Sequence, residues 1–145
     1  TNVKTDVLAE KILSKKYNVR KYYGDPAGMQ AQGQSGLGDI EIFRRKGIKI
    51  YTKRDKISRN IASGVSHTRS FIENAAGGRF FHINEKCVEI MKDLENYRYP
   101  EPKEGSDLKP EPVKDGYHDH CCDMIRYFFI NQFPIKNREF KMRAR

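Results

Sequence analysis

The sequence predicts an α/β domain with a central, mainly parallel sheet flanked by helices. Segments in which apolar residues recur every three or four positions, as in amphipathic helices, alternate with short segments typical of strands. Strands that alternate with helices in this way are usually parallel and joined by right-handed crossovers. At 145 residues, residues 1–145 are interpreted as a single domain or part of one.

Helical spacing is clear in several segments. The first carries Val7, Leu8, Ile12 and Leu13 on one side and begins near Thr5 or Asp6, either of which could cap it. Asp39 is the expected cap of a second helix, and a third has a buried stripe that begins at Ile57 and recurs to Ile72. The expected helices cover residues 3–17, 39–46, 57–74, 85–96 and 118–131.

Three short segments have the composition or alternation of strands, namely residues 19–23, 48–52 and 79–83. Residues 97–116 carry Pro100, Pro102, Pro110 and Pro112 among charges, which predicts an extended, flexible loop within the domain. Residues 133–145 form a basic tail.

The charge balance favours a polyanionic partner. The chain holds 28 Lys and Arg against 19 Asp and Glu, which gives a net charge of +9. No apolar run approaches the roughly 20 residues that a membrane-spanning helix needs, so no membrane partner is expected. An odd number of Cys, three, argues against a disulfide framework and for a reducing, cytoplasmic setting. No GxxxxGK[ST] motif is present.

Two acidic positions are the candidate metal ligands. Asp25 follows the strand at 19–23, and Asp123 lies one turn into the last helix beside an apolar face. Mg²⁺ and Mn²⁺ prefer such oxygen ligands. Asp119 shares a helix face with Asp123 and is a further candidate. The alternatives are that Asp25 only forms a turn before Pro26 and that Asp119 only complements the helix dipole. A charge at Asp123 next to the core needs a partner, which a metal could supply.

A dense basic loop precedes the third helix. Lys53, Arg54, Lys56 and Arg59 are the candidate DNA-binding residues, because phosphate contacts provide affinity and position without reading sequence. The alternative is a solvated basic surface. Zinc binding by the His and Cys residues of 118–122 is disfavoured because no second ligand pair completes a site. Cys121 and Cys122 are poor nucleophile candidates, since apolar helix neighbours raise a thiol pKa.

Several stretches together resemble the C-terminal nuclease domain of phage large terminase subunits. They are the helix before the first strand, Asp25-Pro26-Ala27, Arg44-Arg45-Lys46-Gly47-Ile48, the Lys-rich loop before Ile57, Glu95-Asn96-Tyr97-Arg98-Tyr99 and the run from Lys114 to Tyr127. The last run matches a family ending of an Asp-His pair followed by Asp-Ala-x-Arg-Tyr. Met124 replaces the Ala of that pattern.

The resemblance implies a partial ribonuclease H-like fold with three essential acids and two Mg²⁺ or Mn²⁺ ions. Asp25 matches the second acid and Asp123 the third, and Asp119 falls where extra carboxylates assist. The first acid lies on an opening strand that is expected upstream of Thr1. The implied activity is nearly sequence-independent cutting of concatemeric double-stranded DNA in the host cell cytoplasm. The implied partners are a packaging ATPase domain, the portal and the small terminase subunit.

The sequence therefore predicts a metal-dependent DNA endonuclease. Two alternatives stay open. One is a nuclease of the same fold that resolves Holliday junctions, which would prefer branched DNA. The other is a non-catalytic DNA-binding or assembly module, which would bind DNA without a metal requirement.

Overall fold

The computed structural model describes residues 4–31, 36–101 and 111–135. Within them the chain is mixed helical and strand structure, as predicted, and its two strands pair in parallel. The elements are α1 (Thr5–Ser14), β1 (Tyr22–Tyr23), the 3-10 helix η1 (Pro26–Met29), α2 (Asp39–Arg45), β2 (Ile50–Tyr51), α3 (Lys56–Arg59), α4 (Ile61–Ile72), α5 (Val88–Asn96) and α6 (Asp119–Gln132).

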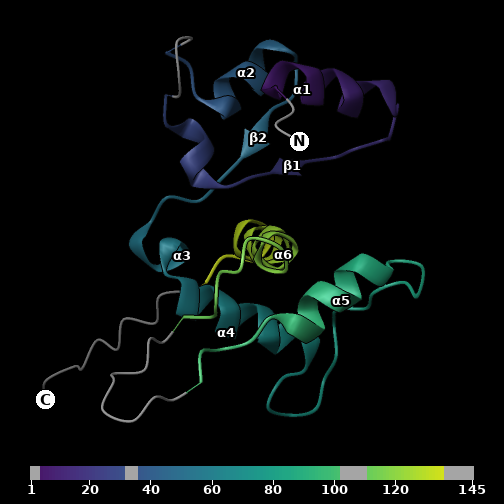
Figure 1. Cartoon of the computed structure of the whole chain (residues 1–145), viewed down its shortest axis with the longest axis vertical. Helices are drawn as coiled ribbons and strands as arrows, with labels where there is room; N and C mark the ends of the chain where they lie inside the picture. The colour runs from purple at the N-terminus through teal and green to yellow at the C-terminus, as the bar shows by residue number, and fades with distance from the viewer. Residues whose placement is uncertain (1–3, 32–35, 102–110, 136–145) are drawn as a thin grey trace, which may run out of the picture.

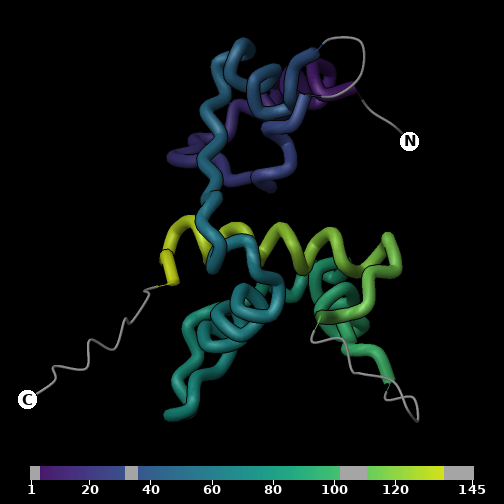
Figure 2. Tube along the Cα trace, turned by 90° about the vertical axis from the view of Figure 1, so that its left-hand side faces the viewer, coloured from purple at the N-terminus to yellow at the C-terminus, as the bar shows by residue number. Residues whose placement is uncertain are grey.

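The elements form two groups with α6 between them. α1, α2, η1 and the two strands lie on one side of α6, α4 and α5 lie on the other, and α3 lies beside α6 (Figure 1). In the view turned by 90°, α6 runs across the molecule directly below the first group (Figure 2). It packs on α4 and α5 and also contacts β1. No helix in the described ranges is long and apolar enough to cross a membrane.

The sheet is smaller than the sequence predicts. β1 and β2 are two residues each, paired Tyr22 to Ile50 and Tyr23 to Tyr51. The predicted strand at 79–83 is wrong. There the backbone N–H groups of Phe80 and Phe81 donate to the Phe71 carbonyl at 2.8 and 2.9 Å. That carbonyl is near the end of α4 and therefore lacks a helical partner. The segment instead bonds to the end of α4, and its Phe81 ring packs against Phe129 of α6 with centroids 5.2 Å apart.

The helices are confirmed with corrected boundaries and caps. The segment 57–74 is two helices, because Asn60 is extended and its side chain caps α4 by accepting from the Ser63 N–H at 2.8 Å. α1 is preceded by Lys4 without a side-chain cap, and Thr5 instead donates to Asp39 at 2.6 Å. α2 is preceded by Gly38, so Asp39 is its first residue rather than its cap. α5 begins at Val88, three residues later than predicted.

Burial also departs from the expected stripes. On α1, Val7, Leu8 and Leu13 are largely exposed, whereas Ala9 is fully buried. The small Ala9 side chain lets α1 approach its neighbour α2 closely. Val88 on α5 is likewise exposed. Residues 102–110 of the predicted loop at 97–116 and residues 136–145 of the basic tail at 133–145 lie outside the described residues.

The core lies where α6 meets α4. Ile125, Phe129 and Ile130 of α6 are buried, and the Phe129 ring stacks on Phe71 of α4 at 4.5 Å between centroids. The helices approach closely at Gly64. A Cβ there would lie 2.8 Å from Cδ of Arg126 and 3.0 Å from Cδ1 of Ile130. The packing therefore needs a glycine at this position.

Gly64→Ala is expected to destabilise the protein by about 1 kcal/mol net. The added methyl overpacks the α4–α6 interface at a cost of about 1–3 kcal/mol, and the better helix propensity of Ala returns about 1 kcal/mol. Urea denaturation measures the difference. Ser66→Ala, at an exposed position of α4, is the control. It gains the higher helix propensity of Ala without overpacking the α4–α6 interface. Equal stabilities for the two variants would contradict the close packing at Gly64.

Candidate functional site

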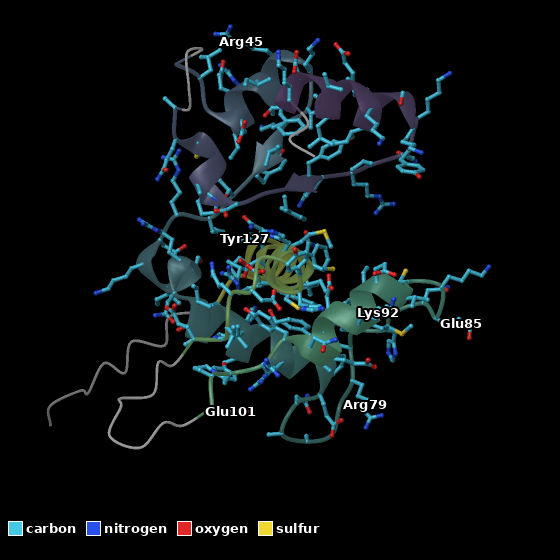
Figure 3. All side chains as sticks on the ribbon, in the orientation of Figure 1. Arg45, Arg79, Glu85, Lys92, Glu101 and Tyr127 are labelled. Carbon is cyan, nitrogen blue, oxygen red and sulfur yellow. The ribbon has the colours of Figure 1, made fainter. Side chains whose placement is uncertain are left out.

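The structure brings Asp25 and Asp123 to one pocket. We call it the acidic pocket; its volume is about 260 Å³ and it lies between the end of β1 and α6. Its described lining residues are Tyr23, Gly24, Asp25, His120, Asp123, Met124 and Tyr127. On α6 the lining positions are three or four residues apart, so they form one face of the helix. Figure 3 shows Tyr127 on the side of α6 that faces the first group of elements.

The end of β1 is held against α6 by the residues just before Asp25. The Tyr23 ring meets the edge of Phe128 with centroids 5.9 Å apart, and its hydroxyl donates to the side chain of Gln132. The Gly24 N–H donates to the Tyr51 carbonyl at 3.2 Å. A Cβ at Gly24 would lie 2.9 Å from Cγ2 of Ile50, so the absence of a side chain lets the strands approach here. These contacts hold the end of β1 in place, so Asp25 lies at the pocket.

Asp25 is exposed and has a local structural role. Its Oδ1 accepts from the Ala27 N–H at 2.8 Å and caps η1, as the turn interpretation expects. Tyr127 lines the same pocket as Asp25. Burial raises the Tyr127 pKa to about 12, the nearby Arg126 charge opposes that rise, and the hydrogen bond to Asp25 adds to it. The phenol therefore stays protonated at neutral pH and can donate to Asp25.

Asp123 has a cationic partner within the chain. Its Oδ1 accepts from Nε and Nη2 of Arg126 at 3.1 and 2.8 Å, and Nζ of Lys114 lies 3.7 Å from Oδ2. Burial alone would lower the Arg126 pKa, but the hydrogen bonds and charge of Asp123 outweigh it, so the pKa is raised. A metal is thus not required to balance the Asp123 charge, contrary to the sequence argument.

Asp119 is placed differently. It is 6% exposed, its Oδ1 accepts from the Gly116 N–H at 2.8 Å, and it is not among the described residues that line the acidic pocket. This hydrogen bond holds the loop before α6 against the start of the helix. The proposal that Asp119 assists metal binding therefore finds no geometric support, because the side chain is committed to this loop.

A second cavity carries arginines and adjoins the first. We call it the arginine groove; its volume is about 450 Å³, and it shares Asp25 and Tyr127 with the acidic pocket. Arg54 and Arg59 line it, and both are exposed. Lys53 and Lys56 are also exposed but are not among its described lining residues. Two of the four predicted DNA-binding residues therefore lie directly beside Asp25.

The His and Cys residues near the start of α6 are dispersed. His118 Nδ1 lies 2.6 Å from Asp115, whereas His120 lines the acidic pocket. Burial raises the pKa of the Cys122 thiol to about 12 and also raises that of Cys121. The described parts of the chain hold no group of three or more His, Cys, Asp or Glu side chains placed to share a metal ion.

Arg126 and Tyr127 are the site residues whose roles sequence reasoning missed. The Asp123–Arg126 contact has the i,i+3 spacing of a helical ion pair, so spacing alone could have found it. The Tyr127–Asp25 contact depends on how β1 docks on α6, and local sequence carries no signal for it. No family model, curated protein or solved structure matches the chain.

Cysteine labelling tests the buried thiol environment. Iodoacetamide at pH 8 is expected to modify Cys87 faster than Cys122, because Cys122 is 5% exposed and its raised pKa leaves little thiolate. Peptide mass spectrometry with fragmentation separates Cys122 from its neighbour Cys121. Rapid labelling of Cys122 in the folded protein, with Cys87 protected, would show that α6 is packed differently.

Proposed function

We propose that the protein is a Mg²⁺- or Mn²⁺-dependent DNA endonuclease of the ribonuclease H-like class, related to the nuclease domain of phage large terminase subunits. One observation carries the proposal. Two carboxylates from distant parts of the chain, Asp25 and Asp123, line one pocket at the carboxyl end of a parallel strand. Ligand sites of α/β sheets favour such strand ends.

The donor set of the acidic pocket suits a hard divalent ion. Mg²⁺ is commonly held by one or two protein carboxylates together with water and substrate phosphates. Asp25 is exposed, and within the described ranges Oδ2 of Asp123 has the Lys114 ammonium, 3.7 Å away, as its ionic partner. Both carboxylates could therefore take a ligand without breaking the Asp123–Arg126 pair. A second ion would need the further acid that the terminase resemblance implies.

The arginine groove supports DNA as the substrate. Arg54 and Arg59 present exposed guanidinium groups beside Asp25, and guanidinium groups bind phosphate oxygens with two hydrogen bonds. The net charge of +9 adds a long-range attraction for a polyanion. A DNA strand bound along this groove would place a phosphodiester at the acidic pocket, since the two cavities share Asp25.

The residues of the chain then have distinct roles. Asp25 and Asp123 would hold the divalent ion, which supplies activation of water and neutralisation of the leaving 3′ oxygen when bound. Arg54 and Arg59 hold the backbone of the strand, with Lys53 and Lys56 contributing positive charge from the same exposed segment, which runs into α3. In the terminase setting, the substrate is concatemeric double-stranded DNA in the host cytoplasm. The partners would be the packaging ATPase domain, the portal and the small terminase subunit.

One observation favours a second candidate, a non-catalytic DNA-binding module. Both carboxylates already have protein partners, because Asp25 caps η1 and Asp123 pairs with Arg126. A module of this kind would keep the basic groove and use the acids only to hold the fold. It would bind DNA equally well with and without divalent ions.

Plasmid nicking by the protein in its full natural length separates these candidates. Nicking that requires Mn²⁺ or Mg²⁺ and stops on chelation is expected, with at least a hundredfold loss in Asp25→Asn. This change keeps an acceptor for the Ala27 N–H, so the fold should be retained. The exposed Asp6 gives the control variant Asp6→Asn. DNA binding without nicking in any metal would favour the module, and a preference for four-way junctions would favour a resolvase.

The salt dependence of DNA binding tests the arginine groove. Replacing Arg54 and Arg59 together by Gln is expected to reduce the slope of log K against log salt by about 2, because two phosphate contacts are lost. Fluorescence anisotropy with a duplex oligonucleotide measures the slope. The control replaces Arg20 and Arg98, both exposed and neither lining the groove. Equal slopes for the two double variants would place the DNA elsewhere.

A further inference from the structure

Two consecutive residues of α6 engage the two carboxylates of the acidic pocket. Arg126 binds Asp123, and Tyr127 lines both the acidic pocket and the arginine groove next to Asp25. Consecutive residues on a helix point about 100° apart, so one can face the core while the other faces the pocket. Arg126 and Tyr127 therefore link the buried side of α6 to the two carboxylates: Arg126 bonds to Asp123, and Tyr127 lines the pocket beside Asp25.

Arg126 is held firmly in place. Its side chain is 4% exposed, its Cγ and Cδ pass closely over Gly64 of α4, and its guanidinium lies 4.5 Å from the centroid of the Tyr127 ring. A buried guanidinium with these neighbours has little freedom to reorient. Because both of its hydrogen bonds end on Oδ1 of Asp123, it fixes that oxygen.

The two oxygens of Asp123 consequently differ. Oδ1 is committed to the buried Arg126, whereas the ionic partner of Oδ2 among the described residues is the Lys114 ammonium at 3.7 Å, on a side chain that is 56% exposed. Because the Lys114 side chain is 56% exposed and its ammonium lies 3.7 Å from Oδ2, beyond hydrogen-bond distance, it can move into solvent more easily than the buried Arg126. Oδ2 is therefore the oxygen that an incoming cation would meet.

On the basis of the proposed function, we propose that Arg126 and Tyr127 are positioning residues that orient Asp123 and Asp25 toward one shared divalent ion. Arg126 orients Asp123 by holding Oδ1, and Tyr127 orients Asp25 through its hydroxyl. Neither touches the ion. Outer partners of this kind typically change metal affinity by about 10–100-fold when they are removed.

Tyr127→Phe tests the second half of this arrangement. The change removes one hydroxyl and keeps the ring beside Arg126, so the thermal unfolding midpoint should stay near that of the unaltered protein. Mn²⁺ affinity, measured by isothermal titration calorimetry on the whole chain, is expected to fall about tenfold. The control is Tyr22→Phe, a half-buried tyrosine of β1 that does not line the acidic pocket, and it should leave Mn²⁺ affinity unchanged.

A second pair of variants separates positioning from simple charge competition. Lys114→Gln removes a cation that only competes for Oδ2, so Mn²⁺ binding should tighten about threefold. Arg126→Gln also removes a cation, yet binding should weaken because Oδ1 is released. Tighter binding by Arg126→Gln would overturn the positioning role of Arg126. Should that variant fail to fold, Arg126→Lys, which keeps the charge but loses the fork of donors, is expected to weaken Mn²⁺ binding in the same way.

The outcomes distinguish this inference from the proposed function. If Mn²⁺ binds and Asp25→Asn abolishes binding while Tyr127→Phe binds as tightly as the unaltered protein, the positioning role of Tyr127 is wrong and the metal site stands. If the unaltered chain binds no Mn²⁺, both the proposed metal site and the positioning roles are wrong. If Tyr127→Phe binds weakly at unchanged thermal stability, the positioning role is supported.

Discussion

The docking of the end of β1 on α6 is the contact on which the candidate site depends. Tyr23 packs on Phe128 and donates a hydrogen bond to Gln132, and Asp25 lines the same pocket as Tyr127, the residue before Phe128. The chain that leads from β2 into α3 is the covalent link between the two groups. Both cavities of the site lie along this junction and share Asp25 and Tyr127.

The electrostatics of the junction follow from the same arrangement. In a chain rich in Lys and Arg, a carboxylate usually has a cationic neighbour, and the buried Arg126 is the principal partner of Asp123. Removing one member of a buried pair leaves an uncompensated charge, which is costly. This pairing explains how Asp123 can sit next to the α4–α6 core without a metal. It leaves the other carboxylate oxygen, Oδ2, without a bond to Arg126, and the proposed metal site depends on that oxygen.

Much of the architecture could be predicted from the sequence, and the exceptions have physical causes. Helical spacing located every major helix, and the alternation of elements predicted parallel strands. The inward face of α1 could not be predicted, because burial of Ala9 rather than Leu8 or Leu13 depends on how α2 lies against it. The segment 79–83 has a strand-like pattern, yet its N–H groups bond to the end of α4. In the site, the Asp123–Arg126 pair follows from spacing, whereas the Tyr127–Asp25 contact exists only through tertiary docking.

The central claim is that Asp25 and Asp123 hold the same divalent ion, and paramagnetic broadening by Mn²⁺ tests it most directly. In a ¹⁵N-labelled sample, substoichiometric Mn²⁺ should broaden the amide signals of Gly24 and Ala27 together with those of His120 to Met124, and excess Mg²⁺ should restore both sets. Broadening of only one set, or broadening spread over unrelated exposed acids such as Glu85 and Glu101, would contradict a shared ion at this junction.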